Sequence, residues 1–256
     1  MTAALQRTVD EDGRSLFLLK GETMLQYRLS GMSRTTQDID GLVRTDLDEF
    51  LGKLDATLTE SWGPLTMTRG EAQEIRVPTR IVNPRRFDIK VAIKGVTWRR
   101  VQVEISLDEG NAGIRTEEIP SPSLAGFGLP TPERLVSLSM AYQIAQKIHA
   151  STDPHDPPHE VNDRARDVVD LLLLRDLATR TGHPALEEIH NAVTDIFAAR
   201  AVEAQAMGMP PRTWPVALVA HRHWLESYAD AAKSAEVAID LEHAVAELNE
   251  WLLSLH

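Results

Sequence analysis

Two aspartates separated by one apolar residue, Asp38-Ile39-Asp40, stand just before the apolar pair Leu42-Val43. In a β-strand successive side chains point to opposite faces, so both aspartates would point one way and Ile39 would point into a core. Their carboxylates would then lie about 6–7 Å apart along the strand and repel each other. Because hard oxygen ligands suit Mg²⁺ or Mn²⁺, the pattern predicts a strand that carries a divalent-metal site.

The residues upstream of this pair predict a strand, a turn and a short helix. The apolar run Leu16 to Leu19 is typical of a buried strand, and Gly21 closes it. A helical segment follows from about Thr23 to Leu29, and residues 30–37 form a small polar loop before Asp38.

Taken together, Lys20-Gly21, Arg34-Thr35 and Asp38-Ile39-Asp40 resemble the signature of polymerase-beta-like nucleotidyltransferases. That signature is a strand, a Gly-Ser or Gly-Gly turn, a short helix and then Asp-x-Asp. The chain is most similar to the variant of AbiEii/AbiGii-type toxins, which reads L-K-G-G-T-x-L and then R-x-S/T-x-D-I-D. It differs at Glu22, where the family carries a small residue beside the nucleotide phosphates and where a carboxylate would repel a triphosphate.

A second match to this superfamily lies on a predicted strand, Arg99 to Leu107. Alternation directs Val103 and Ile105 inward and Glu104 to the other face. The resemblance implies that a neighbouring strand carries a third metal-binding carboxylate, and Glu104 takes this position. Asp88 is the alternative candidate for this third carboxylate. The competing structural interpretation is that Glu104 is only an exposed residue on an edge strand.

A third match joins two predicted helices. The family carries E-K-L-x-A, a loop and then R-x-R-D-x-x-D-L; this chain has Gln146-Lys147-Ile148-His149-Ala150 and then residues 164–171, R-A-R-D-V-V-D-L. The resemblance implies that Asp38, Asp40, Lys147 and Asp167 are catalytic. It also implies that the nucleotide is bound by Lys20, Gly21, Thr23, Arg34 and Arg166. The competing interpretation of Asp167 and Asp170 is a helix surface of weak ion pairs that brace nearby arginines.

The resemblance implies an α/β (α+β) nucleotidyltransferase core with a mixed sheet, followed by an all-helical C-terminal domain. We expect the core to span residues 1–118 and the helical domain, closing the active-site cleft, to span 119–256, because Pro, Ser and Gly are dense from 119 to 132. Lys94-Gly95 predicts a hairpin turn. Further helices are expected at 46–58, 133–150, 161–177, 186–206 and within 215–255, and strands at 75–82, 87–93 and 99–107.

Composition limits the class of protein. The chain of 256 residues has no cysteine, which excludes thiol catalysis and suits a reducing cytoplasm. It has no apolar run long enough for a membrane span and no secretory signal at its start. A net charge of -11 argues against wholesale coating of nucleic acid. Residues 71–100 are nonetheless locally basic. Their cations could contact phosphates, or they could protect an exposed strand edge from pairing with another chain.

The resemblance implies a metal-dependent enzyme that transfers NMP from an NTP to an RNA acceptor, with the tRNA 3′ end as the expected site. It also implies a toxin with a cognate antitoxin, Mg²⁺ or Mn²⁺ as cofactor, and no membrane partner. Two alternatives stay open. One is a nucleotidyltransferase that acts on a protein or small molecule, and the other is a non-catalytic binding module on a decayed nucleotidyltransferase scaffold.

Overall fold

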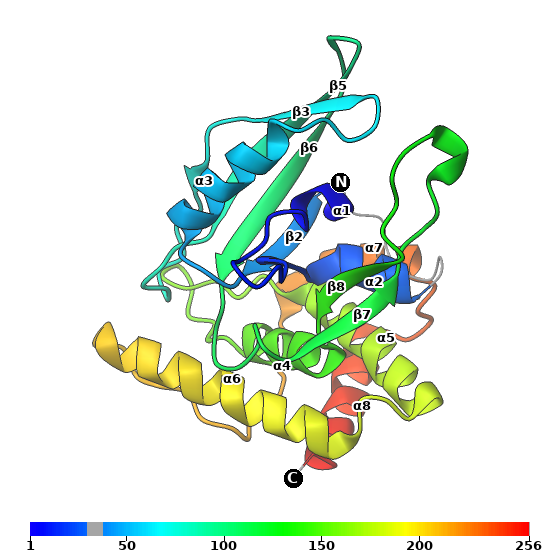
Figure 1. Cartoon of the computed structure of the whole chain (residues 1–256). Helices are drawn as coiled ribbons and strands as arrows, with labels where there is room; N and C mark the ends of the chain where they lie inside the picture. Colours follow the sequence, from blue (N-terminus) through cyan, green and yellow to red (C-terminus); the bar gives the residue numbers. More distant parts are fainter. Residues whose placement is uncertain (30–37, 256) are drawn as a thin grey trace. The chain divides into compact units, whose positions relative to one another are not determined.

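The computed structural model describes residues 1–29 and 38–255. The chain divides after Leu138 into two compact units. Residues 1–28 and 38–138 belong to the first unit, and residues 139–255 together with Leu29 belong to the second. Figure 1 labels most of their helices and strands.

The first unit is built on one mixed sheet with the strand order β3-β5-β6-β2-β1-β8-β7, and β4 pairs with β5 outside this path. The pairs β1–β8 and β2–β6 are parallel and the others are antiparallel. The mixed sheet of the predicted fold class is therefore confirmed. The strands are β1 (Phe17–Leu19), β2 (Asp38–Val43), β3 (Leu65–Arg69), β4 (Gln73–Glu74), β5 (Arg85–Ile93), β6 (Val96–Leu107), β7 (Thr116–Pro120) and β8 (Arg134–Leu138).

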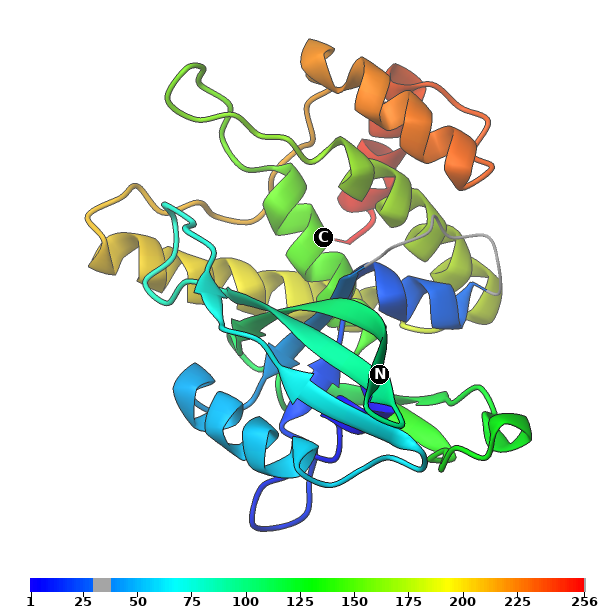
Figure 2. The ribbon, with the colours of Figure 1, turned by 90° about the horizontal axis from the view of Figure 1, so that it is seen from above.

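Helix α3 (Leu47–Leu58) supplies much of the core of this unit. Asp46 caps it, and its carboxylate accepts hydrogen bonds from the backbone N–H groups of Asp48 and Glu49 at 2.9 and 3.1 Å. Phe50 is fully buried, and its ring stacks on Phe17 of β1. Figure 2 shows α3 beside the strands from above. The other helical segments of the unit are α1 (Thr2–Leu5), α2 (Gly21–Arg28) and η1 (Ala125–Phe127).

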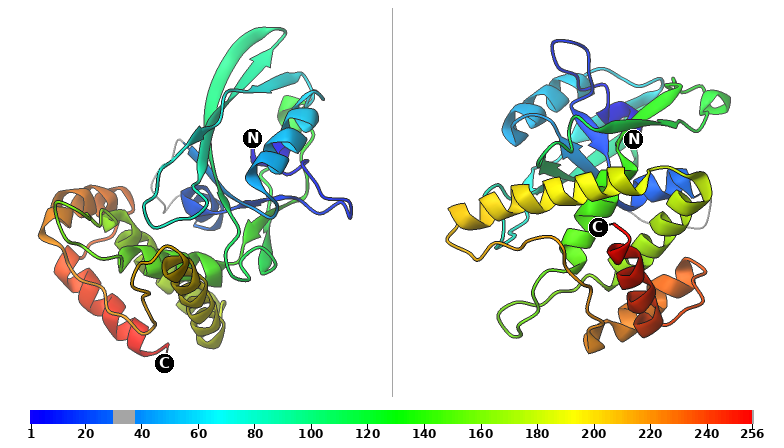
Figure 3. Two further views of the ribbon diagram at one scale, coloured as in Figure 1. Left: turned by 90° about the vertical axis from the view of Figure 1, so that its left-hand side faces the viewer. Right: turned by 90° about the horizontal axis from the view of Figure 1, so that it is seen from below.

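The second unit is helical, as predicted. Its elements are α4 (Met140–Ser151), α5 (Ala165–Thr181), α6 (Leu186–Ala206), η2 (Arg222–Trp224), α7 (Leu225–Ser234) and α8 (Leu241–Leu253). Helix α4 packs on α5 and α6, and α5 also packs on α7 and α8; Figure 3 shows these helices from two sides. Trp224 and Tyr228 are buried in this core. No helix within the described residues is long and apolar enough to cross a membrane.

Four sequence-based expectations need correction. The expected helix 133–150 is strand β8 followed by α4, because residues 134–138 pair with both β1 and β7. The first unit therefore extends past the boundary expected at 118/119, to Leu138. The expected strand at 75–82 is absent from the structure, and that segment contains turns instead. The N-terminal turn of the helix expected at 161–177 is irregular, so α5 begins at Ala165.

Candidate active site

The two aspartates lie on β2 as the alternation predicts. Ile39 between them is 9% exposed, whereas Asp38 and Asp40 are half-buried. Strand β6 runs parallel to β2, and the register places Asp40 opposite Glu104 and Asp38 opposite Gln102. Directly paired residues share a face of a sheet, so Asp38, Asp40 and Glu104 lie on one face.

Gly21 begins α2 directly against this row. Its φ is +64°, a conformation that disfavours any residue with a side chain. A Cβ atom at this position would stand 2.2 Å from Oδ2 of Asp40 and 2.8 Å from its Cβ and Cγ. Glycine is therefore required for two separate reasons, the backbone angle and the close approach of Asp40.

Hydrogen bonds fasten the start of α2 to β2. The backbone N–H of Lys20 donates to the carbonyl of Asp40 at 3.0 Å, and the Thr23 hydroxyl donates to the carbonyl of Asp38 at 3.0 Å. The Lys20 ammonium reaches β6 and donates to Oγ of Ser106 at 2.6 Å. The turn that the motif predicted as a nucleotide site thus lies beside both aspartates. Glu22 in the first turn of α2 is buried, with an exposed fraction of 5%.

Glu104 has a partner that the sequence interpretation missed. Arg86 faces it across the β5–β6 pair, and Oε1 of Glu104 accepts from Nε of Arg86 at 2.7 Å. The terminal guanidinium nitrogen lies 2.6 Å from the same oxygen. Alternation along β5 could have indicated this residue, because Arg86 shares a face with Asp88. Asp88 itself pairs with Gln102 and lies one strand further from β2 than Glu104 does.

The carboxylates on this face stand in register without forming a closed cage. Within residues 1–29 and 38–255, no three Asp, Glu or His side chains are gathered closely enough to hold a metal ion. Arg86 already engages one oxygen of Glu104, Oε1, and a metal ion would compete with the guanidinium for that oxygen.

Lys147 in the helical unit is held by two carboxylates. Its ammonium donates to Oδ1 of Asp167 at 2.7 Å and to Oδ2 of Asp170 at 2.6 Å. The exposed fractions of the Lys147 and Asp170 side chains are 12% and 0%. Burial by itself lowers the pKa of Lys147, but attraction and hydrogen bonding from the two aspartates outweigh burial and raise that pKa. Lys147 is therefore positively charged at neutral pH.

Asp170 pairs with Lys147. Its side chain is completely buried against Lys147, because α5 turns this face toward α4. Arg164 lies 4.0 Å from Asp167, and Arg166 is exposed. Arg34, the remaining predicted phosphate contact, lies outside the described residues.

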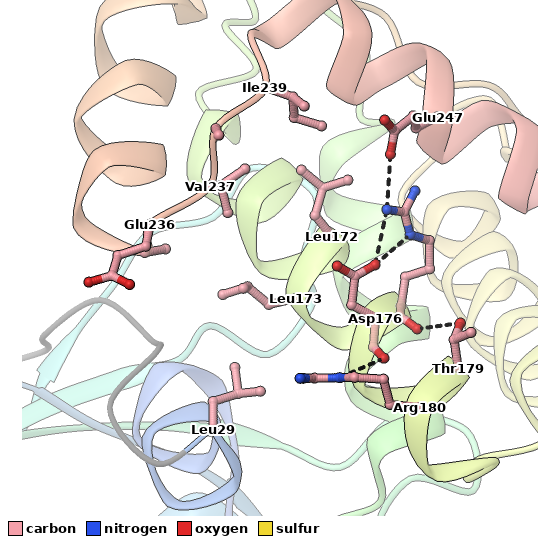
Figure 4. A pocket seen from close by; sticks show the side chains of 13 residues that line it. Leu29, Leu172, Leu173, Asp176, Thr179, Arg180, Glu236, Val237, Ile239 and Glu247 are labelled. Atoms are coloured by element: carbon pink, nitrogen blue, oxygen red, sulfur yellow. Dashed lines mark hydrogen bonds and ion pairs between the residues drawn. The ribbon is translucent and has the colours of Figure 1, made fainter.

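A separate hollow of about 590 Å³ lies in the helical unit (Figure 4). Its lining includes Leu172, Asp176, Val237 and Glu247, and none of the predicted site residues. The arginine at its wall, Arg175, is paired with Glu247 at 3.0 Å. The hollow is therefore not part of the predicted active site.

A family profile agrees with the motifs. The profile of the family described as "Nucleotidyl transferase AbiEii toxin, Type IV TA system" matches residues 3–247. Among solved structures, the chain is similar to MenT4, a nucleotidyltransferase toxin from Mycobacterium tuberculosis H37Rv. The identity is 16%, the match covers 94% of this chain and 85% of that chain, and the TM-score is 0.37. No curated protein matches the sequence.

Proposed function

Because the chain belongs to the AbiEii family of nucleotidyltransferase toxins, we propose that it transfers NMP from an NTP to an RNA acceptor, at the tRNA 3′ end. An acceptor hydroxyl oxygen forms a bond to the α-phosphorus as its proton passes to water. The bond from that phosphorus to the α–β bridging oxygen breaks, and pyrophosphate leaves with the electron pair. The chain acts as the toxin of a toxin–antitoxin pair with a cognate antitoxin. The lack of cysteine suits a cytoplasmic location.

The parallel register of β2 and β6 is the observation that carries the proposal. It puts Asp40 beside Glu104 and keeps Asp38 on the same face. The contact of Gly21 with Asp40 adds support, because it ties the phosphate-binding turn to the same carboxylate. Catalysis of phosphoryl transfer depends mainly on positioning and charge stabilisation, which this arrangement can supply.

Asp38, Asp40 and Glu104 are the residues that would hold one or two Mg²⁺ or Mn²⁺ ions, since carboxylate oxygens suit both metals. A bound ion supplies positive charge that lowers the pKa of the acceptor hydroxyl and neutralises the phosphates. Arg86 contacts Oε1 of Glu104, so a metal ion would share this carboxylate with the guanidinium or compete for that oxygen.

The nucleotide is bound by Lys20, Gly21 and Thr23, with Arg34 and Arg166 as further phosphate contacts. The helical unit contributes Lys147, whose ammonium has three N–H donors and directs two of them to Asp167 and Asp170. The third N–H donates to a phosphate oxygen. Asp167 and Asp170 fix the position of the ammonium.

Incubating the wild-type protein with each α-³²P-labelled NTP and total RNA tests the proposal. We expect label on RNA in the presence of Mg²⁺ or Mn²⁺, and no label from γ-³²P-labelled NTP. Label on protein or on a small molecule would support the first alternative. Absence of both NTP binding and transfer would support a non-catalytic module and contradict the proposal.

A further inference from the structure

The outer half of the β5–β6 hairpin is a basic surface on an acidic protein. Residues 89–101 contain four cations, Lys90, Lys94, Arg99 and Arg100, and no acidic residue, whereas the whole chain has a net charge of -11. All four cations are exposed. Such a local concentration of positive charge favours contact with a polyanion.

A tryptophan lies within this basic surface. Trp98 is 65% exposed. The strand register is interrupted here, because Val91 pairs with Arg99 and Ala92 pairs with Thr97, which leaves Trp98 between them without a partner residue on β5. A β-bulge redirects the bulged side chain out of the regular alternation. The fold therefore presents a large aromatic ring among cations.

The basic surface continues into the face that carries the carboxylates. Arg100 pairs with Lys90, and Lys90 pairs with the exposed Thr68 of β3, so the three side chains share one face. Arg100 and Glu104 share this face because they are four residues apart on β6. The distance between them along the strand is about 13 Å, a span that a few nucleotides of a single strand can cover.

One edge of the hairpin is also open. β2 pairs with residues 102–107 of β6 and stops there. In the described part of the chain, no strand pairs with that edge of residues 96–101. Ligand can therefore reach Trp98 and Arg100 from the side of the strand as well as from the face.

We propose that this outer half of the hairpin binds the single-stranded end of the RNA acceptor. A base stacks on Trp98, and the phosphates contact Lys90 and Arg100, so that the reacting terminus lies over Asp38 and Asp40. The proposal rests on the proposed function, because it assigns the acceptor-binding surface of the same site. Aromatic rings bind single-stranded bases largely regardless of sequence.

Charge favours RNA over a protein partner on this surface. A tryptophan surrounded by arginines can also belong to a protein interface, but a cation-only surface requires an acidic partner. The cations could instead guard an exposed strand edge against self-association. That role predicts that charge-removing variants form oligomers while their affinity for RNA stays unchanged.

Fluorescence anisotropy with a fluorescein-labelled single-stranded oligoribonucleotide, without NTP, tests the proposal. Trp98→Ala should weaken binding by ~10-fold, since loss of one stacked base has an effect of this order, and Trp98→Phe should retain most of the affinity. Arg100→Gln should reduce the slope of log K against log salt by about one. The matched controls are Phe127→Ala, a 77% exposed aromatic residue at η1, and Arg115→Gln, an exposed cation before β7; both should bind as the wild type does.

Transfer assays separate this inference from the proposed function. If the wild type labels RNA while Trp98→Ala and Arg100→Gln keep the wild-type KM for RNA, the inference is wrong and the proposed function stands. If the wild type labels no RNA, the anisotropy result still decides whether the hairpin binds it. Equal affinity of the wild type, Trp98→Ala and Arg100→Gln for the oligoribonucleotide overturns the inference in either case.

Discussion

Replacing Gly21 with alanine probes the contact between the phosphate-binding turn and Asp40. A non-glycine residue at φ +64° costs about 1–2 kcal/mol, and a change of this size lowers the melting temperature by about 2–8 °C. The second effect is local: the new Cβ would lie 2.8 Å from Cβ of Asp40, which side-chain rotation cannot relieve. β2 or α2 must shift, and either shift changes the position of Asp40 relative to the phosphate-binding turn. Because misplacement of about 1 Å in a catalytic group can reduce the rate ~100-fold, we expect a loss of transfer of that order.

Gly13→Ala is the matched control for this prediction. Gly13 has a φ of +78°, but a Cβ there would meet no atom within 4 Å. Gly13→Ala should therefore lose only the stability that the φ angle costs, and Gly21→Ala should lose at least as much, as measured by circular dichroism during heating. Only Gly21→Ala should lose NMP transfer, as measured with α-³²P-labelled NTP well below either melting temperature. Equal activity of the two folded variants would refute the argument that Gly21 positions Asp40.

Three further predictions concern single side chains. Lys147→Met removes the ammonium that pairs with the buried Asp170, so the free energy of unfolding should fall by up to about 3–5 kcal/mol. The exposed Lys233→Met should be neutral in the same thermal melt. Equal melting temperatures of the two variants would contradict the contribution of the buried pair. Arg86→Gln removes the cation that competes for Glu104. Because an exposed ion pair contributes at most about 1 kcal/mol, the Mg²⁺ concentration for half-maximal transfer should fall by up to ~5-fold. An increase in that concentration would mean that Arg86 positions Glu104 for metal binding. Burial, together with the charges of Asp240 and Glu247, raises the pKa of Tyr228 to about 12. The stability advantage of the wild type over Tyr228→Phe should therefore hold below the unfolded tyrosine pKa of about 10 and decline as the pH rises to 12. Denaturant titrations of both proteins across this pH range measure the difference.

Local periodicity correctly predicted the helices, strands and turns whose conformation depends mainly on the local sequence. Residues 38–43 form the expected strand with Ile39 buried, and α6 has the expected bounds, 186–206. The turn at Lys94-Gly95 is confirmed, with φ values of +49° and +80°. In each case the alternation, the helical stripe or the glycine was sufficient, because no distant pairing competes with it.

Long-range pairing accounts for the errors. Leu135 and Val136 fit a helical stripe as well as a strand, and only the pairing of β8 with β1 and β7 decides between them. Ser139 was the available signal, since it caps α4 by accepting a hydrogen bond from the N–H of Tyr142. Strand β3 was missed although Leu65 and Met67 alternate with exposed Thr66 and Thr68.

The candidate site divides in the same way. Strand alternation placed Asp38 and Asp40 on one face, and family resemblance paired Lys147 with Asp167, which the structure brings into contact. The Arg86–Glu104 pair depends on the register of β5 with β6. The burial of Asp170 depends on the packing of α5 against α4. Neither can be obtained from spacing within one segment.

Single-turnover transfer from α-³²P-labelled NTP to RNA, by Asp38→Asn and Asp40→Asn, tests the central claim most directly. Both aspartates are half-buried and point away from the core, so the variants should melt within a few degrees of the wild type. Asp48→Asn on α3 is the matched control, since its carboxylate is 77% exposed and lies outside the proposed site. The account predicts a loss of at least ~100-fold in both site variants, as for other preorganised charges at a reacting phosphate, and wild-type transfer by the control. Wild-type transfer by folded Asp40→Asn would contradict it.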